Sequence, residues 1–198
     1  MAGRRRTAAG RMLGVGGLLG AGSMMLGLPG PVAYAGPRGG GVTHGQAAIA
    51  RSGGATVIQQ RSPRAAISWE SFDIAPGERV EFRQPSTSAI ALNSVRNARP
   101  TRIQGALSAN GQVWLQNPAG VLFGRGAEVD VGGLLATSAR LDHAGFAAGR
   151  DSFSGGSGPV VNEGRIRAGE GGVALVAPVV ENRGRILARE GDVALAAA

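Results

Sequence analysis

The sequence predicts an all-β fold, a right-handed parallel β-helix whose first strands form a cap. Three observations support this: glycine accounts for 35 of 198 residues, hydrophobic residues reach 43% with only 4% aromatic, and part of the chain repeats. A core of Val, Leu, Ile and Ala with glycine at corners suits stacked short strands better than a helical bundle. Glycine does not recur at every third position, which excludes collagen, and the apolar content is too high for a disordered chain.

The repeat is clearest in the carboxy-terminal third. Ten residues between Asn162 and Leu175 recur at a fixed offset between Asn182 and Leu195. A period of about 20 residues is too short for most helix-pair repeats, and the leucine-rich consensus is absent, which leaves one turn of a β-helix. We therefore expect a single-stranded, pectin-lyase-like solenoid with identical residues stacked at about 4.8 Å. At this period the mature chain allows up to about eight coils.

The elements before the repeat are less regular. Residues 36–41 are expected to form a flexible lead-in because most of them are glycine. Residues 42–60 and 67–83 contain alternating apolar and polar residues typical of half-buried strands, and a Pro-Gly turn interrupts the second range. Both ends of a solenoid expose unpaired strand edges. We therefore expect the strands of residues 42–92 to act as its amino-terminal cap.

Residues 1–35 have the features of a secretory signal peptide. Four arginines precede an apolar, glycine-rich stretch, and Ala33-Tyr34-Ala35 forms a small-x-small cleavage pattern. We expect the mature chain to begin near Gly36. The alternative is a membrane anchor, for which the stretch is short and diluted by glycine, and no later run approaches membrane-spanning length. The three consecutive arginines leave twin-arginine export open beside the general route.

The composition excludes several classes of function. The formal charge is +8, but four of the 21 basic residues precede residue 36, which leaves 17 arginines against 13 acids. These arginines are scattered and lack the interleaved aromatics of a nucleic-acid surface, so no nucleic-acid partner is expected. The absence of cysteine excludes disulfides and thiolate sites. The two histidines, His44 and His143, have no metal or triad spacing, and we interpret both as solvated loop residues. The sequence predicts no metal, no cofactor and no catalytic residue.

The most specific motifs lie between Ile67 and Gly133. They are Trp69–Ile74, Gln84–Ser86, Ala91–Asn93, Ile103–Gly105 and, as the strongest run, Ala109–Gly124. Their order resembles the amino-terminal haemagglutination-activity domain of two-partner secretion (TPS) exoproteins, the group that includes filamentous haemagglutinin and large contact-dependent inhibition proteins. The resemblance covers nearly the whole mature chain, residues 36–198, and implies a β-helical secretion domain.

One position departs from that family. Its signature turn is Asn-Pro-Asn-Gly, whereas this sequence has Asn117-Pro118-Ala119-Gly120. Proline at the second position and glycine at the fourth still favour a type I turn, and the Asn117 side chain can cap it. Any contact made by the second asparagine of the family is lost at Ala119.

The resemblance implies a secretion pathway. The exoprotein would reach the periplasm unfolded, where the periplasmic domains of an outer-membrane TpsB-type β-barrel transporter bind it, and it would fold coil by coil at the cell surface. We expect transporter recognition to involve Asn117, Pro118 and Gly120, with Asn93 and Asn110 in support. All five suit turns and corners equally well. Residues 36–198 would then be the front of a longer solenoid on a secreted, adhesin-like protein.

Two alternatives stay open from the residues alone. One is a fragment of a β-helical carbohydrate-active enzyme, in which acids such as Glu70, Asp73, Glu128 and Asp130 would line a paired-carboxylate cleft. Fold alone cannot support that activity. The other is a stand-alone adhesive fragment that binds host or bacterial surfaces. Turnover of a polysaccharide would identify the enzyme, and transporter-dependent export would identify the secretion domain.

Overall fold

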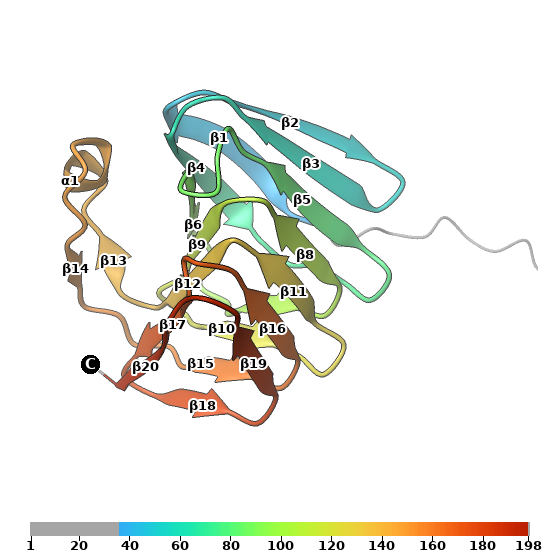
Figure 1. The fold of residues 1–198 in the computed structure, drawn as a ribbon, viewed down its shortest axis with the longest axis vertical. Coiled ribbons are helices and arrows are strands. Elements are labelled where there is room, and N and C mark those ends of the chain that lie inside the picture. Colours follow the sequence, from blue (N-terminus) through green and yellow to red (C-terminus); the bar gives the residue numbers. More distant parts are fainter. Residues whose placement is uncertain (1–35, 198) are drawn as a thin grey trace, which may run out of the picture. The chain divides into compact units, whose positions relative to one another are not determined.

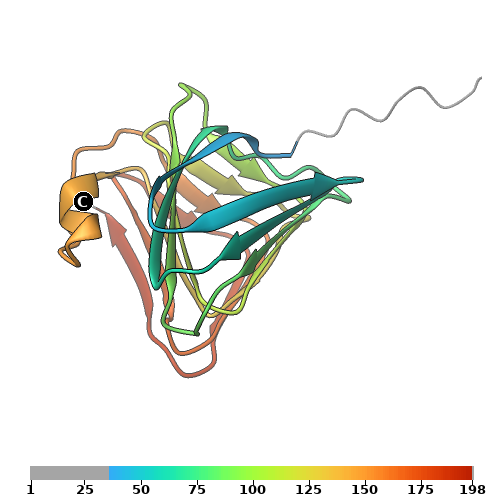
Figure 2. The ribbon, with the colours of Figure 1, turned by 90° about the horizontal axis from the view of Figure 1, so that it is seen from above.

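The computed structural model describes residues 36–197, and these form a parallel β-helix (Figure 1). Two seven-stranded sheets and one four-stranded sheet surround a common apolar interior. Viewed from above, the three sheets form the sides of a triangle (Figure 2). The predicted fold class is confirmed. The predicted signal peptide, residues 1–35, lies outside the described residues and stays a prediction.

Strands from successive coils form the sheets. The first large sheet contains, in order, β1 (Arg38–His44), β4 (Arg64–Ser71), β6 (Ile90–Val95), β9 (Gln112–Gln116), β12 (Gly133–Thr137), β17 (Val173–Ala177) and β20 (Val193–Ala197). The second contains β2 (Ala47–Ser52), β3 (Ala55–Gln60), β5 (Arg79–Arg83), β8 (Ala106–Ala109), β11 (Glu128–Val131), β16 (Arg165–Ala168) and β19 (Arg185–Ala188). The third contains β7 (Thr101–Ile103), β10 (Val121–Phe123), β15 (Val160–Asn162) and β18 (Val180–Asn182).

The amino-terminal cap is smaller than the sequence predicts. Strand β1 pairs antiparallel with β4, and β2 pairs antiparallel with β3. Strands β3 and β4 already lie parallel to β5 and β6. Residues 38–52 therefore form the cap, and most of the range 42–92 that the sequence assigned to it builds the first coils. The expected flexible lead-in is also wrong, because Gly39 and Gly40 adopt φ of 76° and 96° within an irregular β1.

The repeat fixes the register of the last coils. Asn162 faces Asn182, Ile166 faces Ile186 and Leu175 faces Leu195 in parallel strand pairs. The Asn162 Nδ2 donates to Asn182 Oδ1 at 2.8 Å. Each of these asparagines also accepts, through Oδ1, the backbone N–H of the glycine two residues later, at 3.1 and 3.3 Å. The predicted ladders are confirmed, and the asparagine ladder closes the corner after β15 and β18.

The solenoid has about six turns rather than the eight that the sequence allows, because each large sheet contains six parallel strands. Part of the missing length is an excursion between β12 and β15, made of β13 (Arg140–Leu141), α1 (His143–Ala147) and β14 (Phe153–Ser154). Strands β13 and β14 pair antiparallel outside the solenoid, beside the first sheet (Figure 1). A second apolar cluster of Ala66, Leu92, Leu141 and Phe146 attaches this excursion to β4 and β6.

Aromatic rings fill the interior beneath the cap. Trp69 and Phe72 make an edge-to-face contact at 5.3 Å, and Phe72 stacks on Phe82 at 6.5 Å. All three are fully buried, whereas Val193 and Leu195 in β20 are 47% and 48% exposed. This last coil has a neighbour on one side only. The expected continuation into a longer solenoid stays a prediction.

Candidate functional site

The turn at Asn117–Gly120 lies at the corner between β9 and β10, and the Asn117 side chain is buried completely. Its Nδ2 donates to the Arg99 carbonyl at 2.9 Å and to the Thr101 hydroxyl at 3.0 Å. Its Oδ1 accepts the Ala119 N–H at 2.9 Å, and the Gly120 N–H donates to the Asn117 carbonyl at 2.8 Å. Asn117 therefore closes its own turn and ties it to the preceding coil.

The next coil holds the same turn from the other side. The Gly158 N–H donates to the Pro118 carbonyl at 3.0 Å, and the Val121 N–H donates to the Pro159 carbonyl at 3.0 Å. A Cβ on Gly120 would lie 2.5 Å from the Pro159 oxygen, and Gly120 has a φ of 110°. Glycine is required here by both its backbone conformation and the close approach. The predicted cluster of Asn117, Pro118 and Gly120 is thus one turn clamped between two coils.

A polar groove of about 650 Å³ lies beside the tip of the turn. Pro118 and Ala119, the half-buried tip residues, line it together with groups from β6, its following loop and the excursion. These groups include Ser94, Arg96, Arg140, His143 and Ser157. Within residues 36–197, no acidic residue lines the groove, whereas Arg96 and Arg140 do, so these residues give it a positive charge. Sequence reasoning missed this groove because the excursion that builds one wall carries no repeat signal.

Asn93 lies inside the solenoid on β6 and is not a surface residue. It is 0% exposed, and its Oδ1 accepts the indole N–H of Trp69 at 2.9 Å. Its Nδ2 donates to the Ala91 carbonyl at 3.0 Å. Asn93 pairs with Leu115 across β6 and β9, which places it near the start of the Asn117 turn. Asn93 is therefore a core residue that provides a hydrogen-bond acceptor for the buried Trp69 indole N–H.

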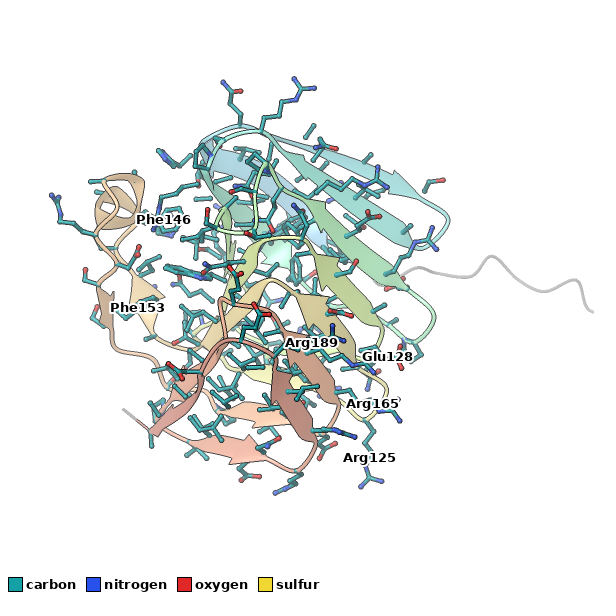
Figure 3. All side chains as sticks on the ribbon, in the orientation of Figure 1. Arg125, Glu128, Phe146, Phe153, Arg165 and Arg189 are labelled. Carbon is teal, nitrogen blue, oxygen red and sulfur yellow. The ribbon has the colours of Figure 1, made fainter. Side chains whose placement is uncertain are left out.

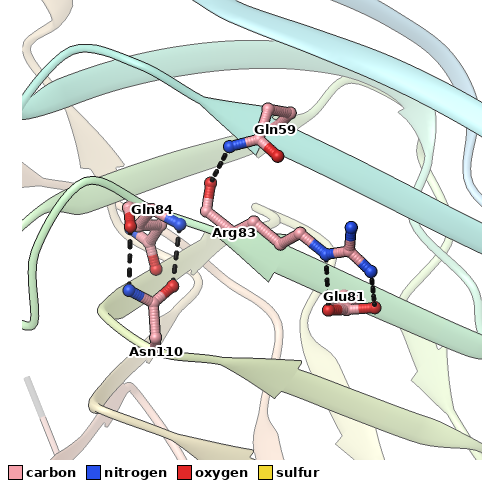
Figure 4. Close-up of polar contacts among 5 residues, drawn as sticks. All are labelled: Gln59, Glu81, Arg83, Gln84 and Asn110. Atoms are coloured by element: carbon pink, nitrogen blue, oxygen red, sulfur yellow. Dashed lines mark hydrogen bonds and ion pairs between the residues drawn. The ribbon is translucent and has the colours of Figure 1, made fainter.

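Asn110 lies at a different corner, between β8 and β9, and its side chain is exposed. It accepts the Gln84 backbone N–H at 2.7 Å and donates to the Gln84 carbonyl at 2.8 Å (Figure 4). The structure therefore does not bring Asn110 into the Asn117 turn. Asn110 and Asn117 share one use of the asparagine side chain, which is to bind backbone groups of the preceding coil.

The acidic residues considered for an enzyme do not gather in one cleft. Glu70 is exposed on β4, and Asp73 accepts the Arg102 N–H at 2.8 Å. Glu128 and Asp130 share a shallow depression of about 170 Å³ on the second sheet. Glu128 lies 3.8 Å from Arg165, and both side chains are labelled on the outer face in Figure 3.

A second surface pair lies on β5, where Arg83 donates to Glu81 at 2.7 Å (Figure 4). This hydrogen bond holds the pKa of the Glu81 carboxyl below its usual value. The pair is open to solvent and contributes little to stability. Within residues 36–197, no group of three or more histidines, cysteines or acids is arranged to hold a metal ion, and no helix in that range is long and apolar enough to cross a membrane.

The two histidines, interpreted from the sequence as solvated loop residues, lie in a strand and a helix and make contacts with other side chains. His44 belongs to strand β1 and lies edge-on to Phe146 at 6.4 Å, so it is not a solvated loop residue. His143 is exposed as expected, but it begins α1 and its Nε2 lies 3.2 Å from the Ser94 hydroxyl. Neither contact could be read from the sequence, because each joins the excursion to a distant strand.

Comparison with known proteins gives consistent results. The model of one family, described as the TPS secretion domain, matches residues 33–198. A heme/hemopexin-binding protein of Haemophilus influenzae strain Rd is 42% identical over 106 residues, which are 54% of this chain and 12% of that protein. A second heme/hemopexin-binding protein of Haemophilus influenzae is 48% identical over 85 residues, or 43% of this chain and 9% of that protein.

Among solved structures, the chain is similar to the HMW1 secretion domain from Haemophilus influenzae, with a TM-score of 0.77 and 30% identity. That match covers 81% of this chain and 44% of the other. The aligned region is therefore only about a tenth of the curated relatives, and less than half of the crystallised chain.

Proposed function

The chain belongs to the TPS secretion domain family, and we propose on this basis that it directs a two-partner secretion exoprotein through a dedicated outer-membrane transporter. The family is a secretion domain family and not an enzyme family. The proposal adds the finer steps: the signal peptide carries the chain to the periplasm, the periplasmic domains of the transporter bind residues 36–198, and the domain folds at the cell surface.

The observation that carries this proposal is the match of residues 33–198 to the TPS secretion domain, and the complete burial of Asn117 in the folded turn supports an order of binding before folding. All of its amide hydrogen bonds are used within the domain, to Arg99, Thr101 and Ala119. A transporter can therefore bind this side chain only while the chain is unfolded. Folding then removes the recognised group, so that transporter binding and folding exclude each other at the same residue.

This exclusion gives export a direction. Each coil of a solenoid needs only its predecessor for its contacts, and the strand pairs β4 to β6 and β6 to β9 show that order along the chain. Once the coil containing β9 leaves the pore and Asn117 bonds to the Arg99 carbonyl, the transporter can no longer rebind this side chain. The proposal treats Asn93 in the same way, because it too is fully buried once folded.

Export is the direct measurement. We expect residues 1–198 to appear in the medium only when the matching transporter is present, and we expect Asn117→Ile to abolish that export. For the binding step, we expect the unfolded chain with this substitution to bind the periplasmic domains of the transporter at least about tenfold more weakly, which corresponds to about 1.4 kcal/mol.

The matched control is Thr101→Val, which removes the hydroxyl partner of Asn117 in the fold but leaves the asparagine in place. Both substitutions destabilise the same corner, Asn117→Ile more strongly because it removes three side-chain hydrogen bonds and Thr101→Val removes one. A folding defect alone would therefore impair both variants. The proposal requires that the unfolded Thr101→Val chain binds the transporter normally. Equal loss of binding in both variants, or retention of wild-type chain in the periplasm with a working transporter, would contradict it.

A further inference from the structure

Gly36, at the predicted start of the mature chain, is bound by the buried carboxylate of Glu78. The backbone nitrogen of Gly36 donates to Glu78 Oε1 at 3.2 Å. The other oxygen of this carboxylate, Oε2, accepts the Ala75 N–H at 2.8 Å and so closes the turn before β5. Glu78 is only 6% exposed. One carboxylate therefore links the residue two positions before β1 of the cap to the turn that precedes β5.

Glu78 has no cationic side chain as a partner among the described residues. Arg38, Arg51 and Arg79 line the same pocket of about 410 Å³, but none of them lies within ion-pair distance of Glu78. Arg51 is directed instead to the carbonyls of Pro37 and Gly39, at 3.3 and 2.8 Å. Buried carboxylates are normally paired with a positive charge, because burial of an unpaired charge is costly.

We propose that signal-peptide cleavage after Ala35 supplies the missing cation: the α-ammonium group of Gly36 binds the Glu78 carboxylate and fastens the amino-terminal cap. In the uncleaved chain the same nitrogen is an uncharged amide and makes a neutral hydrogen bond. Cleavage converts it into a charge-assisted hydrogen bond, which is roughly twice as strong. Processing of the chain is thereby coupled to the stability of the cap.

The local structure accommodates the charged group. Residues around Gly36 leave ordinary van der Waals space, since a Cβ added there would lie 3.8 Å from both Glu78 Oε2 and Thr56 Oγ1. Thr56 is a further polar neighbour and is 5% exposed. Pro37 is buried and Arg51 holds its carbonyl, so the nitrogen of Gly36 is directed at Glu78 by the strand that follows it.

The sequence makes the test selective. It contains no lysine, so the α-amino group is the only primary amine of the processed chain. We would purify the chain after export to the periplasm, confirm by mass that it begins at Gly36, and acetylate it with an amine-reactive ester. Removal of the charge is expected to lower the melting temperature by about 2–4 °C. Reductive dimethylation, which retains the charge, is expected to leave the melting temperature unchanged.

The proposal requires that the effect of acetylation on the melting temperature depends on Glu78. In Glu78→Gln, acetylation should have no further effect, whereas in Glu170→Gln, an exposed control, it should lower the melting temperature by the full amount. If Glu78→Gln does not fold, the chain that retains Ala35 replaces it, because its amino group is displaced by one residue and it should melt like the acetylated chain. An equal effect of acetylation with and without Glu78, no effect in the wild type, or a mature chain that begins elsewhere overturns the proposal. The proposal rests on cleavage after Ala35, and its test needs no transporter, so it can fail independently of the proposed function.

Discussion

Replacement of Asn117 by leucine is expected to lower the free energy of unfolding by about 3–5 kcal/mol, although the two side chains are close in size. The loss is polar. Leucine leaves the Arg99 carbonyl, the Thr101 hydroxyl and the Ala119 N–H without the partner that Asn117 provides. Removal of one partner in a buried hydrogen bond costs the desolvation of the group left behind, about 1–3 kcal/mol each. The total stays below three times the largest cost per group, because the groups near solvent regain a hydrogen bond to water.

Denaturation by urea measures this loss. We expect the midpoint to fall with an unchanged slope, since the surface exposed on unfolding stays the same. Asn110→Leu is the matched control, because Asn110 also binds backbone groups of the preceding coil through two hydrogen bonds, but at an exposed position. Water replaces those bonds, so the expected cost is only about 1 kcal/mol. Equal costs for the two variants would mean that burial of Asn117 does not stabilise the corner.

The asparagines of this chain show which features could be predicted from the sequence and which could not. A repeat of identical residues at a fixed offset predicts ladders, and Asn162 faces Asn182 as expected. The Asn117-Pro118-Ala119-Gly120 turn was also predictable, because proline and glycine restrict its conformation. Burial was not predictable for Asn117 and Asn93, since it depends on what the neighbouring coil places against them.

The features that sequence reasoning missed involve contacts between distant segments. The cap depends on β1 returning antiparallel to β4, and the polar groove depends on the excursion bringing Arg140 and His143 to the side of Pro118. No periodicity marks either segment. The glycines of residues 36–41 predicted a flexible segment, whereas Gly39 and Gly40 adopt positive φ within β1, which is paired with β4.

Phe146→Ala is expected to release the excursion while the solenoid stays folded. The Phe146 ring is fully buried. The Arg64 guanidinium lies 4.1 Å from its centroid, and the rings of Trp114 and His44 meet it edge-on at 5.8 and 6.4 Å. Truncation of a buried phenylalanine to alanine costs about 3–5 kcal/mol. The contacts that remain with the coils are the ion pair of Arg64 with Asp151, the contact of His143 with Ser94, the Phe153 ring beside Trp114, and Leu141 packed on Ala66 and Leu92. We expect these to be too weak together to hold the segment.

Two measurements separate local release from global unfolding. Amides of residues 139–159 should lose protection from hydrogen exchange, because local opening needs less free energy than unfolding of the coils. The chain has two tryptophans: the emission of Trp114 should shift to the red, whereas that of Trp69, buried in the core, should not. Phe153→Ala is the control, because Phe153 belongs to the same excursion and lies 6.2 Å from Trp114 but is 39% exposed.

The outcome also bears on where a partner binds the folded domain. Release of the excursion removes Arg140 and His143 from the groove but leaves the Asn117 turn tied to Arg99 and Thr101. Because the proposed recognition acts on the unfolded chain, Phe146→Ala should be exported by the transporter at nearly the wild-type level. Loss of export in this variant, with the solenoid intact by hydrogen exchange, would show instead that the transporter reads the folded groove. Unfolding of the whole domain would show that the excursion is an integral part of the coils.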